Sequence, residues 1–275
     1  MAKTLTLDGT DIRAVSVAGM ETCIEIPSLK VCFDIGHGHR STARNHMVLF
    51  THAHIDHMGG IGHHAATRSL LSMSPPTYVV PRGVEVGVNR LLDAFRALDG
   101  SEIPVNICPL NPGESMPLGA RWSVRPLPSF HPVVSQGYAL MERRKRLRPA
   151  LKDAGREAIR EAALRGESIN EEHEHPRIVF SGDTTIEFIE QNELAQVADI
   201  LIMEVTFVDD RVSVESARKN GHVHLDEIAC RADLFRNKAI LFTHLSARYR
   251  EHEAVAAINE KLPPALRSRV TLLGF

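Results

Sequence analysis

Residues 47–61 read M-V-L-F-T-H-A-H-I-D-H-M-G-G-I, and this stretch decides how the rest of the chain is interpreted. Four apolar residues predict a short buried strand, and three histidines and an aspartate follow it at once. His52 and His54 are two positions apart, so on an extended backbone their side chains point the same way. Asp56 and His57 come where the chain turns, so they can face a second point nearby. The pattern H-x-H-x-D-H therefore offers ligands to two metal ions, and the strand and the glycines argue against a chance crowding of histidines.

The composition is that of an ordinary globular protein. The chain has 275 residues, of which 43% are hydrophobic and 24% charged, and its formal net charge is -2. Any attraction to nucleic acid must therefore come from a local patch. No apolar stretch is long enough to span a bilayer, and the first residues lack the pattern of a signal peptide. The four cysteines are scattered without C-x-x-C spacing, so we expect reduced thiols in a cytoplasmic protein without a membrane anchor.

The predicted elements begin with an antiparallel meander of short strands at residues 4–7, 12–17, 22–26 and 31–33. After residue 60, helices and strands alternate, which favours αβ layers. Helices are predicted at residues 61–73, 84–98, 187–194 and 253–262. Further strands are predicted at residues 78–80, 105–108, 122–126, 137–141, 177–180, 200–203, 239–242 and 270–273.

Residues suited to metal binding or acid–base chemistry return later in the chain. His131, Asp183, Glu204 and His244 stand at the ends of predicted strands, and His222 precedes a predicted helix. A serine and a glycine come directly before the aspartate, so backbone and metal can approach each other closely there.

The stretch 47–61 resembles the signature of the metallo-β-lactamase superfamily, whose fold is an α/β, four-layered αβ/βα sandwich with a dinuclear metal site along one edge. The resemblance implies a single domain over residues 1–275. It also implies seven metal ligands, in chain order His52, His54, Asp56, His57, His131, Asp183 and His244. The second aspartate would bridge the two ions, and Asp34 is either a plain turn residue or a support for the site from behind. Two zinc ions are expected, although the same ligand types accept manganese or iron.

Three later motifs resemble those of ribonuclease Z, the endonuclease of tRNA 3′ ends: M-E-V-T-F at 203–207, G-H-V-H at 221–224 and F-T-H-L-S-A-R-Y at 242–249. The resemblance implies that His222 assists the leaving group or the scissile phosphate and that Glu204 holds this histidine in place. Asp56 would bind a metal and accept the proton of the attacking water. These three residues are the predicted catalytic groups for phosphodiester hydrolysis on a tRNA precursor. Relatives with arms are often dimers, so a homodimer is expected.

The composition changes at about residues 142–176, which we interpret as an arm-like, basic, helical insertion. Four basic residues at 143–146 are followed by Arg148, residues 149–165 predict an alanine-rich helix, and an acidic tail follows. The insertion sits where ribonuclease Z carries its tRNA-gripping arm, but it is short and lacks the usual Gly-Pro turn. It is either a basic handle for phosphate backbones or a solvated surface helix.

Other functions would use the same metal site. A small-molecule phosphodiesterase, or an ester or lactone hydrolase, suits the short insertion and the near-neutral net charge. The basic run and the pair of Glu204 and His222 favour RNA instead. A metal-stabilised binding protein without activity is a third hypothesis, and the complete set of ligand residues argues against it.

Overall fold

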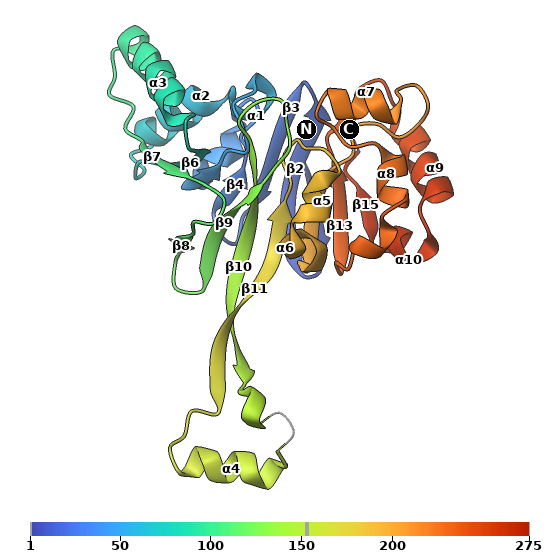
Figure 1. Cartoon of the computed structure of the whole chain (residues 1–275). Helices are drawn as coiled ribbons and strands as arrows, with labels where there is room; N and C mark the ends of the chain where they lie inside the picture. Colours follow the sequence, from blue (N-terminus) through green and yellow to red (C-terminus); the bar gives the residue numbers. More distant parts are fainter. Residues whose placement is uncertain (1, 152–153, 275) are drawn as a thin grey trace.

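Two mixed β-sheets packed face to face form the centre of the computed structural model, which describes residues 2–151 and 154–274 (Figure 1). The first sheet has the order β1 (Lys3–Leu7), β2 (Thr10–Ala18), β3 (Glu21–Ile26), β4 (Val31–Phe33), β5 (Met47–Leu49), β6 (Thr77–Pro81) and β7 (Asn106–Leu110), with β14 (Leu245–Ser246) beside β2. The second has the order β15 (Val270–Leu272), β13 (Ala239–Thr243), β12 (Ile200–Glu204), β11 (Asn170–Phe180), β10 (Gln136–Leu147), β9 (Trp122–Pro128) and β8 (Met116–Leu118). The meander predicted for the first four strands is confirmed, because β1 to β4 pair antiparallel.

Alternating side chains bury both faces of the central strands. In β12, Ile200 and Ile202 belong to the apolar core between the sheets, whereas Leu201 and Met203 belong to a core beneath the C-terminal helices. A third core lies between the first sheet and the N-terminal helices. Strands covered on both faces are continuously apolar, which is why they could be recognised in the sequence. Three cores between four layers confirm the predicted αβ/βα sandwich.

Helices form the two outer layers (Figure 1). The first sheet is covered by α1 (Ile55–Met58), α2 (Ile61–Leu70) and α3 (Glu85–Asp99), with the 3₁₀ helix η1 (Arg40–Arg44) before β5. The second sheet is covered by α5 (Glu187–Gln191), α6 (Glu193–Val197), α7 (Val214–Lys219), α8 (Leu225–Ala229), η3 (Ala232–Leu234), α9 (Glu251–Lys261) and α10 (Pro264–Arg267). Within the described ranges, none of the helices combines the length and the apolar character needed to traverse a bilayer.

The insertion is a two-stranded ribbon with a helix at its tip. β10 and β11 run out of the second sheet together, and their pairing continues as far as Leu147 opposite Asn170. Beyond it lie η2 (Pro149–Leu151) and α4 (Arg156–Leu164), at the far end of the arm (Figure 1). The helix predicted over residues 149–165 is therefore shorter in the structure, and the strands predicted at 137–141 and 177–180 are longer.

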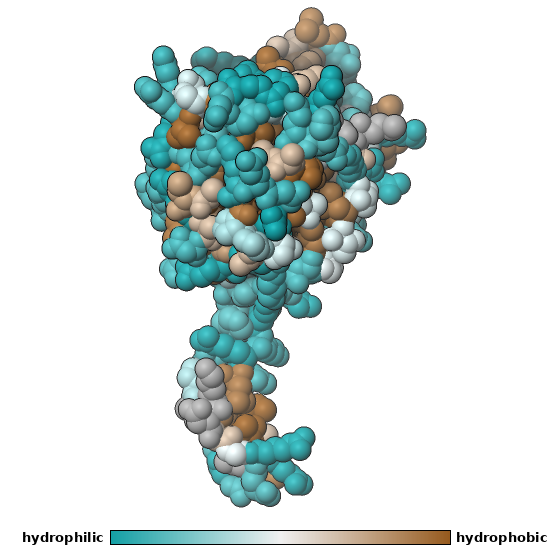
Figure 2. All heavy atoms as spheres, turned by 90° about the vertical axis from the view of Figure 1, so that its right-hand side faces the viewer, coloured by the Kyte–Doolittle hydropathy of each residue, from teal (hydrophilic) through white to brown (hydrophobic). Residues whose placement is uncertain are grey.

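The basic run is part of a strand because the acidic tail pairs with it. Lys145 and Arg146 of β10 stand opposite Glu172 and Glu171 of β11, and Arg146 Nε donates to Glu171 Oε1 at 2.8 Å. Opposite charges that face each other on neighbouring strands stabilise the pair. Figure 2 shows the resulting stem as a narrow hydrophilic column, with apolar side chains gathered near the tip, where Leu164 is 78% exposed.

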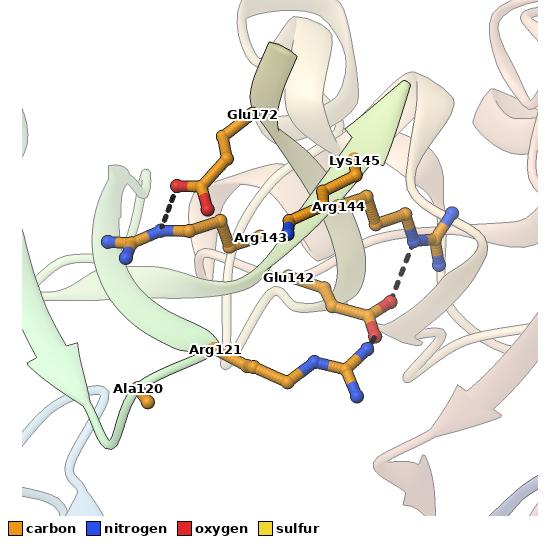
Figure 3. Close-up of a pocket in the computed structure, with 7 residues that line it drawn as sticks. All are labelled: Ala120, Arg121, Glu142, Arg143, Arg144, Lys145 and Glu172. Atoms are coloured by element: carbon orange, nitrogen blue, oxygen red, sulfur yellow. Dashed lines mark hydrogen bonds and ion pairs between the residues drawn. The ribbon is translucent and has the colours of Figure 1, made fainter. Parts of the chain in front are cut away.

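Ion pairs also neutralise the cations at the base of the arm (Figure 3). Arg143 Nε lies 3.7 Å from Glu172 Oε2, and Arg144 Nε donates to Glu142 Oε2 at 2.7 Å. Over residues 142–176, nine lysines and arginines are balanced by eight acidic residues. The insertion as a whole is thus nearly neutral, and its role as a phosphate-binding handle or a solvated surface element stays a prediction.

Candidate metal centre

The side chains selected from the sequence converge at one edge of the two sheets. His52 and His54 follow β5, His131 follows β9, Asp183 follows β11 and His244 follows β13. Their ligand atoms fall into groups whose members lie within 4.8 Å of one another. Strands separated by more than a hundred residues in the chain therefore bring the histidines and the aspartate that follow them to one point. The carboxyl ends of neighbouring parallel strands meet at one edge of a sheet in the same way.

One group contains His52, His54, His131 and Asp183. His131 Nε2 lies 3.4 Å from His54 Nδ1, and His52 Nε2 lies 3.8 Å from Asp183 Oδ2. His52 is completely buried, whereas His54 is exposed, so the group opens from the protein interior to the solvent. Three imidazoles and a carboxylate form a donor set that suits a transition metal such as zinc.

A second group contains Asp56 and His57 from α1 and His244 from the end of β13. Asp56 Oδ2 lies 3.6 Å from His57 Nε2 and 3.7 Å from His244 Nε2. Asp183 Oδ1 lies 3.3 Å from His57 Nε2 and 3.4 Å from His244 Nε2. Because its other oxygen faces His52, the carboxylate of Asp183 stands between the two groups.

The residues present fit metal ions. The Nε2 atoms of His52, His57 and His244 are buried and have no hydrogen-bond partner among the residues that the structure describes, which costs roughly 1–3 kcal/mol for each such group unless a ligand satisfies it. Four donors about 2.0–2.1 Å from a tetrahedral ion are about 3.3 Å apart, and the spacings of 3.3–3.8 Å around Asp183 come close to that value. The fold, the donor types and the orphaned nitrogens together imply a dinuclear metal site.

The opposite ring nitrogens are held by the protein. These contacts join His52 Nδ1 to Thr51 Oγ1 at 3.0 Å, His131 Nδ1 to the Gly221 carbonyl oxygen at 3.0 Å, and His244 Nδ1 to Thr206 Oγ1 at 3.1 Å. Such outer contacts fix the orientation of a ligating imidazole and select its tautomer. The sequence reasoning missed both threonines, although each lies within two residues of a predicted site residue.

Asp34 is one of these supports. It is completely buried, and its Oδ2 accepts hydrogen bonds from His57 Nδ1 at 2.7 Å and from Thr51 Oγ1 at 2.8 Å. Its Oδ1 accepts from the Thr51 backbone N–H at 2.8 Å. The structure therefore favours a supporting role for Asp34 behind the site over the role of a plain turn residue.

Glycine is required where the backbone comes closest to the site. At Gly182, with φ +59°, a Cβ would lie 2.6 Å from Thr51 Cβ, and at Gly221, with φ +76°, it would lie 2.3 Å from Pro132 Cδ. These approaches bring Asp183 beside His52, and the Gly221 carbonyl group beside the ring of His131.

The structure also brings Glu204 and His222 together, beside the two groups. His222 Nδ1 lies 2.9 Å from Glu204 Oε1, and its ring is close enough to Asp183 and His244 to form a third potential metal-binding group. Glu204 is buried and accepts further hydrogen bonds from the Thr184 and Val223 backbone N–H groups and the Thr206 hydroxyl. The carboxylate is therefore held rigidly while it orients the imidazole.

The carboxylates make this edge attractive to cations. Burial lowers the pKa of His222, but Glu204 outweighs burial and raises the pKa to about 9. Burial would raise the pKa of Asp56, yet His244 and His57 hold it at about 2. The pKa of Asp183 is likewise held well below its usual range, against burial, by His244 and His57. Both aspartates are therefore ionised at neutral pH, as metal ligands must be.

Comparisons with known proteins agree with this geometry. The model of the Beta-lactamase superfamily domain matches residues 36–245. The tRNase Z TRZ1 of Arabidopsis thaliana is 39% identical over 278 residues, which cover 99% of this chain and 99% of that protein. The tRNase Z TRZ2, chloroplastic, of the same plant is 35% identical over 93% of this chain and 73% of its own length. The crystal structure of human tRNase Z, short form, shares the fold with a TM-score of 0.55 at 21% identity, covering 97% of this chain and 90% of that one.

The matched domain includes all seven residues of the two groups, and the likeness to the plant proteins extends along almost the entire chain. By its sequence and its fold, the chain belongs to the tRNase Z (ribonuclease Z) family of metal-dependent hydrolases within the β-lactamase superfamily.

Proposed function

We propose that this protein is an endoribonuclease that hydrolyses a phosphodiester bond at the 3′ end of precursor tRNA. The observation that carries the proposal is the position of a two-part His/Asp centre, which opens to the solvent at His54, beside the Glu204–His222 pair. The identity to plant tRNase Z over the full length of the chain supports the same substrate.

Two metal ions would be held by separate sets of residues. His52, His54 and His131 would bind the first, and Asp56, His57 and His244 the second, with Asp183 shared between them. We propose zinc for both ions; manganese or iron would accept the same ligand types. When bound, such ions lower the pKa of a coordinated water toward neutrality and neutralise charge on the phosphoryl oxygens.

The residues of the chain supply the proton transfers. Asp56, ionised at neutral pH, takes up the proton of the attacking water as the new oxygen–phosphorus bond forms. His222, held through Nδ1 by Glu204, presents its other ring nitrogen to the substrate. As an imidazolium it donates a proton to the oxygen that leaves phosphorus, or a hydrogen bond to the phosphoryl group.

The test uses end-labelled precursor tRNA, with bis(p-nitrophenyl) phosphate as a control substrate for the metal centre. We expect a single cut by the zinc-loaded protein, and His222→Ala should lower kcat by about 10²–10⁴-fold while both metals remain bound. His252→Ala, an exposed histidine on α9, is the matched control and should keep wild-type activity.

Other outcomes would redirect the assignment. Full tRNA cleavage by His222→Ala would remove its proposed role. Hydrolysis of the control substrate without tRNA cleavage would point to a small phosphodiester, and inactivity on both substrates would point to an ester or a lactone.

The oligomeric state is part of the proposal. An exposed apolar surface on α2 and α3, here called the α2–α3 surface, includes Leu70 at 84% exposure, Leu98 at 86% and the partly exposed Leu91 and Phe95. We propose a homodimer that covers these side chains, because apolar surface is stabilised when a partner removes it from water. For the compartment, the cytoplasm stays a prediction, since one relative is a chloroplast protein.

A further inference from the structure

A second cationic feature lies away from the metal centre. A cleft of about 840 Å³ surrounds η1 and the β3–β4 turn, and we call it the η1 cleft. It is lined by Arg13, Glu25, Pro27, Lys30, Arg40, Ser41, Ala43, Arg44, Asn45, Leu71 and Met73. Residues 40–45 of this lining directly precede β5, whereas His52 and His54 follow it, so this part of the cleft and the metal centre lie toward opposite ends of the strand.

Most of the positive charge in the η1 cleft is uncompensated. Four cations line it, but Glu25 is its one acidic residue. Glu25 Oε1 lies 3.6 Å from Arg13 Nε. Lys30, Arg40 and Arg44 are exposed, and none of them forms an ion pair with the carboxylates in the described part of the chain. In the arm, by contrast, Arg143, Arg144 and Arg146 of the basic run each form an ion pair with a glutamate.

A buried arginine adds to this charge and shapes the cleft. Arg68 of α2 is only 4% exposed, and its guanidinium donates to the carbonyl oxygens of Ala43 at 2.6 Å, Asn45 at 3.1 Å and Ser74 at 2.8 Å. No carboxylate among the described residues pairs with it, so its charge stays uncompensated beside the cleft. Burial lowers the pKa of nearby His46, and the charges of Arg68 and Lys30 lower it further, as expected in a positive potential.

Glu25 holds two side chains of the same segment. This buried carboxylate accepts hydrogen bonds from Ser41 Oγ at 2.9 Å and Asn45 Nδ2 at 2.9 Å. Hydrogen bonds to Arg68 and Glu25 therefore hold the segment that carries Arg40 and Arg44. Such pre-organisation reduces the entropy lost when a ligand binds.

We propose that the η1 cleft is a second binding site for the phosphate backbone of the RNA substrate, outside the metal centre. The inference rests on the proposed function. Several separated cations in an open cleft suit a chain of phosphates, and arginine forks bind phosphate oxygens in pairs. Arg44 is eight residues before His52, and eight extended residues span at most about 29 Å. One RNA helix can therefore contact the cleft while its end occupies the metal centre.

The test compares two double variants of equal charge change. Arg40→Gln/Arg44→Gln alters the η1 cleft, and Arg236→Gln/Arg267→Gln removes two cations without ion pairs from the second half of the molecule. The KM for precursor tRNA is measured at several salt concentrations, with bis(p-nitrophenyl) phosphate as a check of the metal centre. For the cleft variant we expect KM to rise about tenfold, kcat to change less than twofold, and the slope of log KM against log salt to fall by about 2. The control should match the wild type.

Equal KM values and salt slopes for the two double variants would overturn the proposal. If the wild type fails to cleave precursor tRNA, the proposed function fails first, and fluorescence anisotropy of labelled mature tRNA then tests the cleft alone. Weaker binding and a reduced salt slope for the cleft variant would still support an RNA site there, whereas equal binding by both variants, or none by the wild type, would overturn it. Lys30→Gln gives an independent single-site comparison.

Discussion

Most imidazoles of the candidate metal centre use one ring nitrogen for the protein and leave the other for the site. His57 is tied to Asp34, His244 to Thr206, and His131 to the Gly221 carbonyl group. The supports are themselves hydrogen-bonded, so the rings are oriented before any ion arrives. A ligand set that is already in place loses little conformational entropy on binding, and each support fixes the tautomer needed for coordination.

The Glu204–His222 pair leads to a prediction about pH. In the metal-bound enzyme the pKa of His222 will lie below about 9, because nearby dications disfavour the imidazolium. Glu204 still raises this pKa, so Glu204→Gln should lower it and move the alkaline fall of kcat to lower pH. The measurement is the pH profile of kcat with bis(p-nitrophenyl) phosphate, and Glu193→Gln on the surface of α6 is the control. If kcat of Glu204→Gln fell at the same alkaline pH as kcat of the wild type, His222 would not be the proton donor.

At the scale of elements, the arm is fastened to the body at one carboxylate. The carboxylate of Asp199, whose side chain is 3% exposed, lies within 3.0 Å of nitrogen atoms of Arg144, His175, Arg177 and Lys238. Three of these come from β10 and β11, next to the register shift at the base of the arm. Burial would raise the pKa of Asp199, but these partners hold it below its usual range. The stabilisation is therefore present above the unfolded pKa and is lost as the pH falls through the lower folded value.

Asp199→Asn should loosen the base of the arm. Removing the charge leaves Arg144, Arg177 and Lys238 without their shared carboxylate, at a cost of about 1–3 kcal/mol, between the values typical of exposed and of buried ion pairs. Hydrogen exchange of the β10 and β11 amides beyond Leu140 should become faster, while exchange in β5 stays slow. Asp210→Asn, an exposed carboxylate outside this cluster, is the control. Unchanged exchange in the arm would show that backbone pairing alone holds it.

At the scale of the whole molecule, the exposed α2–α3 surface predicts the oligomeric state. Light scattering on the wild type should give twice the 30.5 kDa of one chain. Leu98→Lys should shift the protein toward monomer, because a charge placed in an apolar interface loses its hydration on association. Leu164→Lys replaces another exposed leucine, on α4 at the tip of the arm, and should leave the dimer intact. A wild-type mass of 30.5 kDa at all concentrations would contradict the proposal.

The amino-acid pattern predicts the strands and the position of the candidate metal centre, and the resemblance of residues 47–61 to a known signature implies the four-layer fold. The strands could be recognised because burial on both faces makes them continuously apolar, and His52, His54, Asp56 and His57 lie so close together in the chain that local backbone geometry alone gathers them. The shape of the arm could not be predicted in this way, because its basic run becomes a strand by pairing with acidic residues about 25 positions later. The cationic cleft depends in the same way on Arg68, which binds carbonyl groups more than twenty residues earlier in the chain. The spacing of apolar residues within one segment shows which of its faces are buried. The charges and backbone groups that the segment contacts come from residues distant in the sequence, so the segment alone does not reveal them.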